Sequence, residues 1–239
     1  MRIRTAALSD IGKVRDENED RFLRDDQLQL YAVADGIGGL AGGAQAAEEA
    51  INQLSRLVRT LPADDAWDFQ ALFTAINEHV AGVGMAIDAT FGIGTTLTVI
   101  RLYDRRLQLA HVGDSCCHLL RDGRLEKLTL DHTVENEMKA RHGHGAIIFL
   151  NPRTRNALTR CIGQPVAPEA DLLMRPLRDG DRLLICSDGV TRCMAEPELA
   201  QVLSGAVDPV AGLKEIIDLA SLRGGHDNAT GVLVFVDAI

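Results

Sequence analysis

The sequence predicts an α+β protein in which antiparallel sheets pack on each other and helices cover the outside. Runs of β-branched and aliphatic residues, bounded by Gly, Asp or Asn, have the pattern of strands. These runs span 28–35, 95–104, 106–114, 116–120, 125–130, 181–188 and 230–237. Turn sequences at 103–108 and 121–126 join neighbouring runs as hairpins, so much of the sheet structure should be antiparallel.

Two longer segments have the apolar periodicity of helices. The apolar face of the first is formed by Ala47, Ile51, Leu54 and Val58. That of the second is formed by Phe69, Leu72, Ile76, Val80, Val83 and Ile87. A third helix is predicted over 208–224, where Asp208 can cap the first turn, Pro209 fits that turn and Gly224 ends the helix.

The length, composition and net charge of the sequence exclude several classes of function. The 239 residues contain no repeat, low-complexity tract or Pro/Ser-rich linker, so we expect one domain over 1–239. The net charge is −9 and there is no basic stripe, which argues against a nucleic-acid partner. No apolar run is long enough to cross a bilayer, and residues 1–14 lack the apolar core of a signal peptide. We therefore expect a cytoplasmic protein with no membrane partner, and a monomer by default.

Aspartates stand at the ends of several predicted strands. Asp35, Asp114 and Asp188 each end an apolar run, and Asp227 precedes the last one. A single aspartate in such a position is usually a turn residue whose side chain bonds a nearby backbone N–H. Four carboxylates in one cleft would repel one another unless a cation neutralised them. Carboxylates and backbone carbonyls suit the hard cations Mg²⁺ and Mn²⁺, so the pattern indicates such a site if these strand ends meet.

A charged segment precedes the first predicted strand. Arg15, Glu19 and Asp20 lie close together in it. One interpretation is a solvated charged turn. The other is a part of the site in which Arg15 binds a substrate phosphate and the two acids hold metal-bound waters. Composition alone leaves both open.

Short motifs follow one another along nearly the whole chain. They are RxxxED at 15–20, VADGIGG at 33–39, GTTLT at 94–98, VGDS at 112–115, LTLDHT at 128–133, NALTRCIG at 156–163, GDRLLICSDGV at 180–190 and HDNAT at 226–230. In this order they resemble the metal-dependent protein phosphatases of type 2C, in their compact bacterial form. The resemblance implies a four-layer αββα sandwich, with two mostly antiparallel sheets flanked by helix pairs and metals in a cleft at one end.

The resemblance also implies which residues hold two Mn²⁺ or Mg²⁺ ions. Asp35 would bridge the two ions, and Gly36 would lend its carbonyl to one of them. Asp188 and Asp227 would be direct ligands of the first ion. Asp114, together with Asp188, resembles the ligands of a third, weaker metal site.

Three further residues have implied roles around these ligands. Glu19 and Asp20 would act mainly through water. Arg15 matches the arginine that holds the substrate phosphate. Asn228 follows the ligand Asp227 and would help to position the ligands without binding an ion itself.

These roles imply a serine/threonine protein phosphatase. It would hydrolyse phosphoserine and phosphothreonine by direct attack of a metal-bridging water, without a phosphoenzyme, while Arg15 and the metals balance charge on the phosphoryl oxygens. Its partners would be phosphorylated proteins, with a serine/threonine kinase and its substrates implied by the family. One alternative is a catalytically weak pseudophosphatase that binds phosphoproteins, and another is a calcium-stabilised structural domain. The enzyme is favoured because every expected ligand position is filled and Arg15 has no role in a plain cation cage.

Three positions depart from the family pattern. Ile37 stands where some relatives carry a histidine that is a candidate general acid, which leaves the proton donor open. Cys116 stands where arginine usually follows VGDS. Asn151 replaces the histidine that usually precedes the proline at 152. It lies in the segment 131–155, which aligns with the mobile flap beside the active site and should shape substrate choice.

The other cysteines, histidines and aromatic residues have simpler interpretations. Five cysteines without a CxxC pair favour reduced, structural thiols, and the adjacent Cys116 and Cys117 should point to opposite faces of a strand. His142 and His144 in the flap are predicted to be exposed, with metal contact or proton donation as the alternative. Residues expected to be structural or to pack in the core are His111, His132, Trp67 and Phe69.

Overall fold

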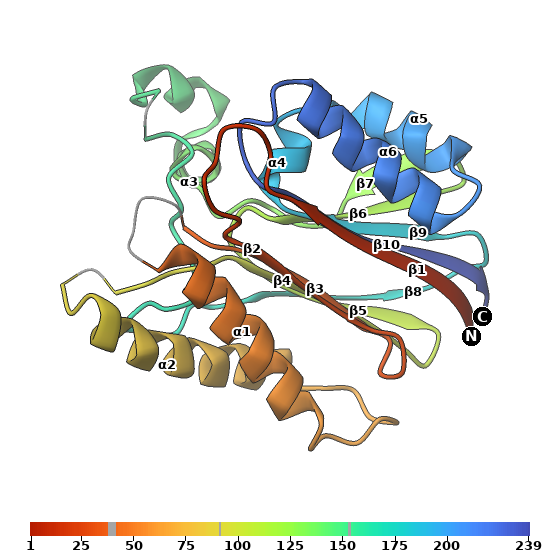
Figure 1. Ribbon diagram of the computed structural model, residues 1–239, viewed down its shortest axis with the longest axis horizontal. Coiled ribbons are helices and arrows are strands. Elements are labelled where there is room, and N and C mark those ends of the chain that lie inside the picture. Colours follow the sequence, from red (N-terminus) through yellow and green to blue (C-terminus); the bar gives the residue numbers. More distant parts are fainter. Residues whose placement is uncertain (38–41, 91, 153) are drawn as a thin grey trace.

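The computed structural model describes residues 1–37, 42–90, 92–152 and 154–239. Two five-stranded sheets pack face to face, and helices cover both outer faces (Figure 1). Each strand pairing within the two sheets is antiparallel. The predicted α+β sandwich of four layers is therefore confirmed.

Each of the two sheets contains at least one hairpin whose strands are neighbours both in the sequence and in the sheet. The first sheet has the order β1-β10-β9-β6-β7 and the second the order β2-β3-β4-β5-β8. The strands of the first are β1 (Arg2–Asp10), β10 (Ala229–Ala238), β9 (Arg182–Cys186), β6 (Cys116–Arg121) and β7 (Arg124–Lys127). Those of the second are β2 (Asp20–Asp25), β3 (Leu30–Asp35), β4 (Leu97–Tyr103), β5 (Arg106–Val112) and β8 (Asp171–Pro176). Because β1 pairs with β10, the two chain ends lie together at one end of the sandwich (Figure 1).

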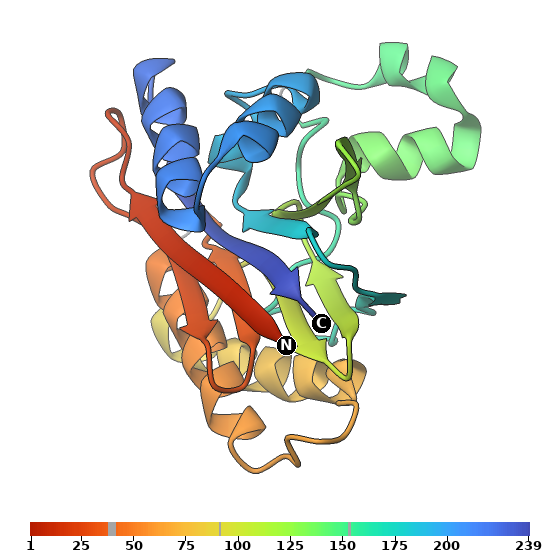
Figure 2. The ribbon, with the colours of Figure 1, turned by 90° about the vertical axis from the view of Figure 1, so that its right-hand side faces the viewer.

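Helices form the two outer layers. The second sheet is covered by α1 (Gly43–Val58) and α2 (Phe69–Ile87), and the first by α5 (Glu196–Gly205) and α6 (Pro209–Leu222) (Figure 1). The short α4 (Asp188–Thr191) follows β9 directly. The helix α3 (Val134–His142) and the 3₁₀ turn η1 (His144–Phe149) project away from the sandwich, as Figure 2 shows.

Three apolar layers hold the sandwich together, and β3 contributes to two of them. Leu30 and Ala32 pack toward α1 and α2, whereas Tyr31 and Val33 lie between the sheets. A central strand that is buried on both faces is apolar at nearly every position. This is why the central strands were predictable as continuous apolar runs.

Three strands that the sequence analysis did not predict are β1, β2 and β8, and all three lie at sheet edges. Edge strands are covered on fewer sides and therefore show a weaker apolar pattern. In β8, Leu172 is 55% exposed and Met174 is 45% exposed. The fourth edge strand, β7, was predicted over 125–130 but ends at Lys127. The helices α3 and α5 were also not predicted.

The predicted helices are confirmed. The apolar residues named for α1 and α2 fall inside those helices. At the start of α6, the side chain of Asp208 accepts a hydrogen bond from the backbone N–H of Ala211 at 2.8 Å, as expected of an N-cap. Within the described residues, no helix combines the length and apolar character needed to cross a membrane.

Candidate active site

Five aspartates lie where strands of both sheets end on one side of the sandwich. From the second sheet, Asp20 begins β2, Asp35 ends β3 and Asp114 follows β5. From the first sheet, Asp188 follows β9 as the first residue of α4, and Asp227 precedes β10. We call these five residues the acid cluster. The sequence motifs therefore meet across the two sheets.

The carboxylates of the acid cluster are close enough to disfavour one another's charge. Burial raises the pKa of Asp35 well above its ordinary value, and the charges of the other four members raise it further. Burial, then the charge of Asp114, raise the pKa of Asp188 to about 8 against the opposing effect of Arg192. Burial likewise raises the pKa of Asp20 and that of Asp114 to about 6. A bound cation would relieve this repulsion.

The backbone of Asp35 is fixed by the start of β4. Its N–H donates to Oγ1 of Thr96 at 2.9 Å, and its carbonyl accepts from the N–H of Thr96 at 2.8 Å. Oγ1 of Thr95 donates to the same carbonyl at 3.0 Å. Oγ1 of Thr96 lies 2.7 Å from Oγ of Ser115, which is next to Asp114. The GTTLT and VGDS motifs thus hold two members of the acid cluster in place.

Two glycines permit close approach of backbone segments at the site. A side-chain carbon at Gly36 would lie 2.3 Å from the carbonyl oxygen of Gly43, at the start of α1. One at Gly189 would lie 2.0 Å from the carbonyl oxygen of Asn228. Only glycine fits these positions, which explains the glycine after each of two strand-end aspartates. Residues 38 and 39 of the VADGIGG motif lie outside the described residues.

Asp20 links the two sheets but keeps one oxygen unsatisfied. Oγ of Ser187 donates to Oδ2 of Asp20 at 2.8 Å and accepts from the backbone N–H of Thr230 at 3.0 Å. Oδ1 of Asp20 is buried and has no hydrogen-bond partner within the described part of the chain. Such an oxygen is costly unless a cation or a water satisfies it. This observation, together with the all-oxygen donor set, fits a hard cation at the acid cluster.

Asn228 organises the loop that carries the N-terminal charged residues. Its Oδ1 accepts from the backbone N–H of Glu19 at 2.9 Å. Its Nδ2 donates to the carbonyls of Ile11 at 2.8 Å and Glu17 at 3.0 Å. The side chain is 4% exposed and so sits in the interior behind the site.

Two arginines contact the acid cluster. Nη2 of Arg15 lies 2.9 Å from Oδ1 of Asp227, and its Nη1 lies 3.5 Å from Glu19. Arg192 forms ion pairs with Asp188 and, at 3.5 Å, with Asp227. Arg192 was not predicted as a site residue, although its spacing of four residues from Asp188 is a signal present in the sequence.

The other predicted residues take the expected places. His111 is fully buried, with Nδ1 2.9 Å from Oγ1 of Thr98, and His132 accepts from the N–H of Gly113 at 3.1 Å, so both are structural as predicted. His142 is exposed, whereas the side chain of His144 lies outside the described part of the structure. Trp67 and Phe69 are buried in edge-to-face contact, which confirms the packing role.

A pocket of 280 Å³ joins the acid cluster to the predicted flap. Its walls carry both signs of charge. They include Asp114, Asp188, Arg192, Asp131, Glu135, Lys139 and Arg155. Within the flap, Glu135 is bridged by Lys139 at 2.7 Å and by Arg155 at 3.4 Å, so these charges already have partners on the same segment.

Comparisons with known proteins identify the family and the fold of the chain. Residues 8–229 match the protein phosphatase 2C family. A putative protein phosphatase 2C-type of Streptococcus pyogenes is 36% identical over 95% of the chain and 94% of that relative. The serine/threonine protein phosphatase PstP of Mycobacterium tuberculosis is 36% identical over 98% of the chain but only 45% of its own length. A structure of the PstP catalytic domain in complex with 2 manganese ions is 33% identical, covers 99% of each chain and has a TM-score of 0.83.

Proposed function

Since the chain belongs to the protein phosphatase 2C family, we propose that it is a metal-dependent serine/threonine protein phosphatase. The single observation that carries this proposal is the acid cluster, in which buried carboxylates from both sheets raise the pKa of Asp35. Such a cluster is unfavourable as a structural element. The same cluster is favourable when it binds the metal ions of a hydrolytic site.

The donor set of the cluster supports Mn²⁺ or Mg²⁺ as the cofactor. The relative PstP is described with two manganese ions. Asp35 would bind both ions, and the carbonyl of Gly36 would be a further ligand. Asp188 and Asp227 would complete the first ion's protein ligands.

The outer residues of the site would act less directly. Glu19 and Asp20 would hold water around the ions, and the unsatisfied Oδ1 of Asp20 supports that assignment. Asp114, whose charge raises the pKa of Asp188, would hold a third, weaker ion together with Asp188. Asn228 would keep the loop of Glu19 in register with Asp227.

The reaction would be hydrolysis by direct attack of water on phosphorus, and bound metal ions would supply the Lewis acidity that makes this water a nucleophile near neutral pH. The chain contributes the binding and orientation of the phosphate. Arg15 points a guanidinium at the edge of the acid cluster, where its planar fork can bind two phosphoryl oxygens. Ile37 cannot donate a proton, so the leaving oxygen needs another donor.

The substrates would be phosphorylated proteins, including those modified by a serine/threonine kinase. The pocket between the acid cluster and the flap 131–155 can receive residues beside the phosphorylated side chain. Its mixed charges make it a place where substrate choice can be set. A cytoplasmic location stays a prediction.

The proposal is tested by phosphate release from a phosphothreonine peptide. The purified protein is assayed with Mn²⁺, with Mg²⁺ and with a chelator, beside Asp35→Asn. Activity that needs the metal and is lost with Asp35 supports the proposal. A folded protein without activity under any metal would contradict it and favour the phosphoprotein-binding alternative.

A further inference from the structure

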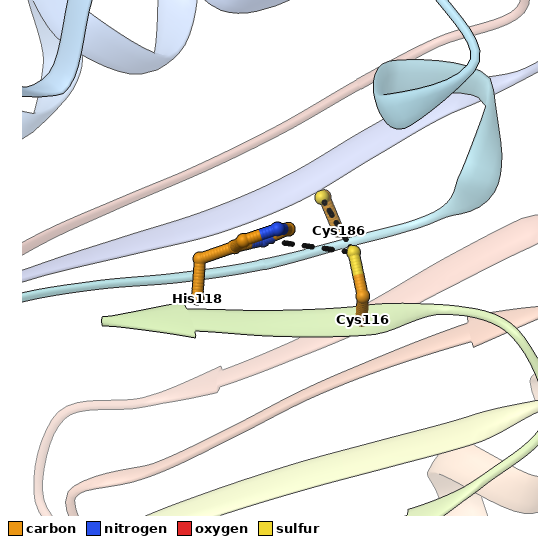
Figure 3. A group of neighbouring side chains, drawn as sticks. All are labelled: Cys116, His118 and Cys186. Atoms are coloured by element: carbon orange, nitrogen blue, oxygen red, sulfur yellow. Dashed lines mark hydrogen bonds between the residues drawn. The ribbon is translucent and has the colours of Figure 1, made fainter. Parts of the chain in front are cut away.

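Three side chains outside the acid cluster form a compact sulfur and nitrogen group. Cys116 and His118 are two residues apart on β6 and therefore share one face of the strand. Cys186, on β9, is the residue directly opposite Cys116 in the sheet register. Figure 3 shows the three side chains turned toward one another between the two strands.

The spacing of the three ligand atoms is that of a metal site. The Sγ atoms of Cys116 and Cys186 are 3.6 Å apart, and Sγ of Cys116 is 3.7 Å from Nδ1 of His118. In a tetrahedral zinc site, Zn–S bonds of about 2.3 Å and a Zn–N bond of about 2.0 Å place two sulfurs about 3.8 Å apart and a sulfur and a nitrogen about 3.5 Å apart. The two measured separations are close to these edges, and the ligand atoms of His118 and Cys186 lie within 4.8 Å of each other.

The surroundings give the group few other partners. All three side chains are at most 1% exposed. Cys116 and Cys186 belong to the apolar layer under α4, α5 and α6, together with residues such as Val190 and Met194. A thiol is a weak hydrogen-bond partner for a buried imidazole. A soft metal ion would satisfy all three atoms better than they satisfy one another.

We propose that Cys116, His118 and Cys186 bind one thiophilic d¹⁰ cation, Zn²⁺ or Cu⁺. On binding, each thiol loses its proton to solvent and forms a sulfur–metal bond. Neutral His118 donates the lone pair of Nδ1 to the ion. No group is oxidised or reduced. Two thiolates neutralise Zn²⁺. Lys127, opposite His118 on β7, is already paired with Asp131 at 2.6 Å and leaves the local charge balanced.

The ligand chemistry separates this site from the acid cluster. Thiolate and imidazole select soft ions, whereas the carboxylates select hard ones. Among the residues that the structure describes, the group contains three ligands, which is the number that leaves a zinc ion one open position and suffices for three-coordinate Cu⁺. The inference does not depend on the phosphatase activity.

The site lies where it can act on the active site. Cys116 follows Asp114 by two residues, and Cys186 precedes Asp188 by two. An ion held by both cysteines would join β6 to β9 just behind these two members of the acid cluster. The expected effect is a more rigid placement of Asp114 and Asp188.

The test uses the full-length protein, reduced and freed of metal by a chelator. It is titrated with Co²⁺ as a spectroscopic substitute for zinc, and then with Zn²⁺ and Cu⁺ in competition with a coloured chelator. We expect one ion per chain, a thiolate-to-cobalt charge-transfer band that Zn²⁺ or Cu⁺ removes, and an increase in Tm with Zn²⁺ or Cu⁺. Excess Mn²⁺ should not remove the band.

Variants locate the site. Cys116→Ser and Cys186→Ser should each lose the band and bind zinc more than about a hundredfold more weakly. The matched control is Cys117→Ser, since Cys117 is the buried neighbour on the opposite face of β6 and should keep the band. Circular dichroism establishes that each variant is folded.

The wild-type protein alone can overturn the inference. No thiolate band and no Tm shift with any of these ions in the folded, reduced protein would contradict it. So would a band that persists in Cys116→Ser, or a Cys116–Cys186 disulfide that forms in peroxide while the reduced protein binds no soft metal. None of these outcomes bears on the acid cluster, whose failure would appear only in the phosphate-release assay.

Discussion

Asp20 lies directly opposite Asp35 in the antiparallel pairing of β2 with β3, so the sheet register itself places two carboxylates side by side. Like charges at opposite positions of a strand pair are destabilising. Both residues are at the end of their strands, where the remaining members of the acid cluster add further negative charge. The fold therefore holds an unfavourable arrangement that a cation would turn into a favourable one.

Asp35→Asn should abolish activity while the metal-free protein becomes more stable. The amide keeps the shape of the carboxyl and has no proton to lose, so its burial no longer carries the free-energy cost of suppressing an ionisation that the unfolded chain permits. Phosphate release should fall at least about a hundredfold. Differential scanning calorimetry in chelator should give a Tm equal to or above that of the wild type. Near-normal turnover would remove Asp35 from the site.

The stability of the metal-free protein should fall as the pH rises from 6.5 toward 8. Asp188 has an ordinary pKa of 3.8 and a folded pKa of about 8, so over this range the folded state holds a proton that the unfolded chain has lost. The free energy of unfolding therefore decreases with pH. His111, whose pKa burial lowers to about 3, has the opposite effect, but only below its ordinary pKa of 6.5.

This pH dependence is measured by chemical denaturation in chelator. Asp188→Asn should reduce the slope between pH 6.5 and about 8, because it removes one of the aspartates whose pKa is raised in the folded state, while Asp35 remains. Saturating Mn²⁺ should also flatten it in the wild type. An unchanged slope in Asp188→Asn would show that Asp188 does not titrate in this range.

Arg15→Ala should weaken the use of phosphosubstrate more than the binding of metal. A charge-assisted hydrogen bond is worth roughly 1.5–3 kcal/mol, which corresponds to about tenfold to a hundredfold in kcat/KM. Steady-state kinetics on a phosphopeptide and calorimetric titration with Mn²⁺ separate the two effects. Unchanged kinetics would exclude Arg15 from phosphate binding.

Arg192→Ala should instead tighten the binding of Mn²⁺. Arg192 pairs with Asp188 and Asp227, so an incoming cation must compete with it. The side chain of Arg192 is 51% exposed, and an exposed pair is worth up to about 1 kcal/mol, so the gain should not exceed about fivefold. Weaker Mn²⁺ binding in the same titration would mean that Arg192 assists the ion.

Asn228→Ala should reduce both stability and turnover. It leaves the N–H of Glu19 and the carbonyls of Ile11 and Glu17, all in part-buried hydrogen bonds, without their partner, at a cost of about 1–3 kcal/mol. Asn77→Ala is the matched control, because Asn77 is equally buried and bonds the backbone of Gly163 and Gln164. Both variants should lose similar stability in urea, but only Asn228→Ala should also lower kcat. Equal loss of kcat in the two would reduce Asn228 to a general structural role.

Local signals in the chain were enough to predict the class of fold, the central strands, the helices α1, α2 and α6, and the residue types of the acid cluster. These features rest on local signals: continuous apolar runs, periodicity of 3.6, capping residues and strand-end aspartates. The edge strands β1, β2 and β8 were not predicted, because a strand that is covered on fewer sides need not be apolar.

Which distant side chains meet depends on the tertiary structure. It placed Asp20 opposite Asp35, brought Arg192 to Asp227, and set Cys116 against Cys186 although 70 residues separate them in the chain. No local pattern contains these contacts, because they depend on strand register and on how the two sheets stack. The sequence motifs therefore predicted which carboxylates belong to the site. The packing of the two sheets brings these carboxylates together, and a bound cation would relieve the repulsion between them.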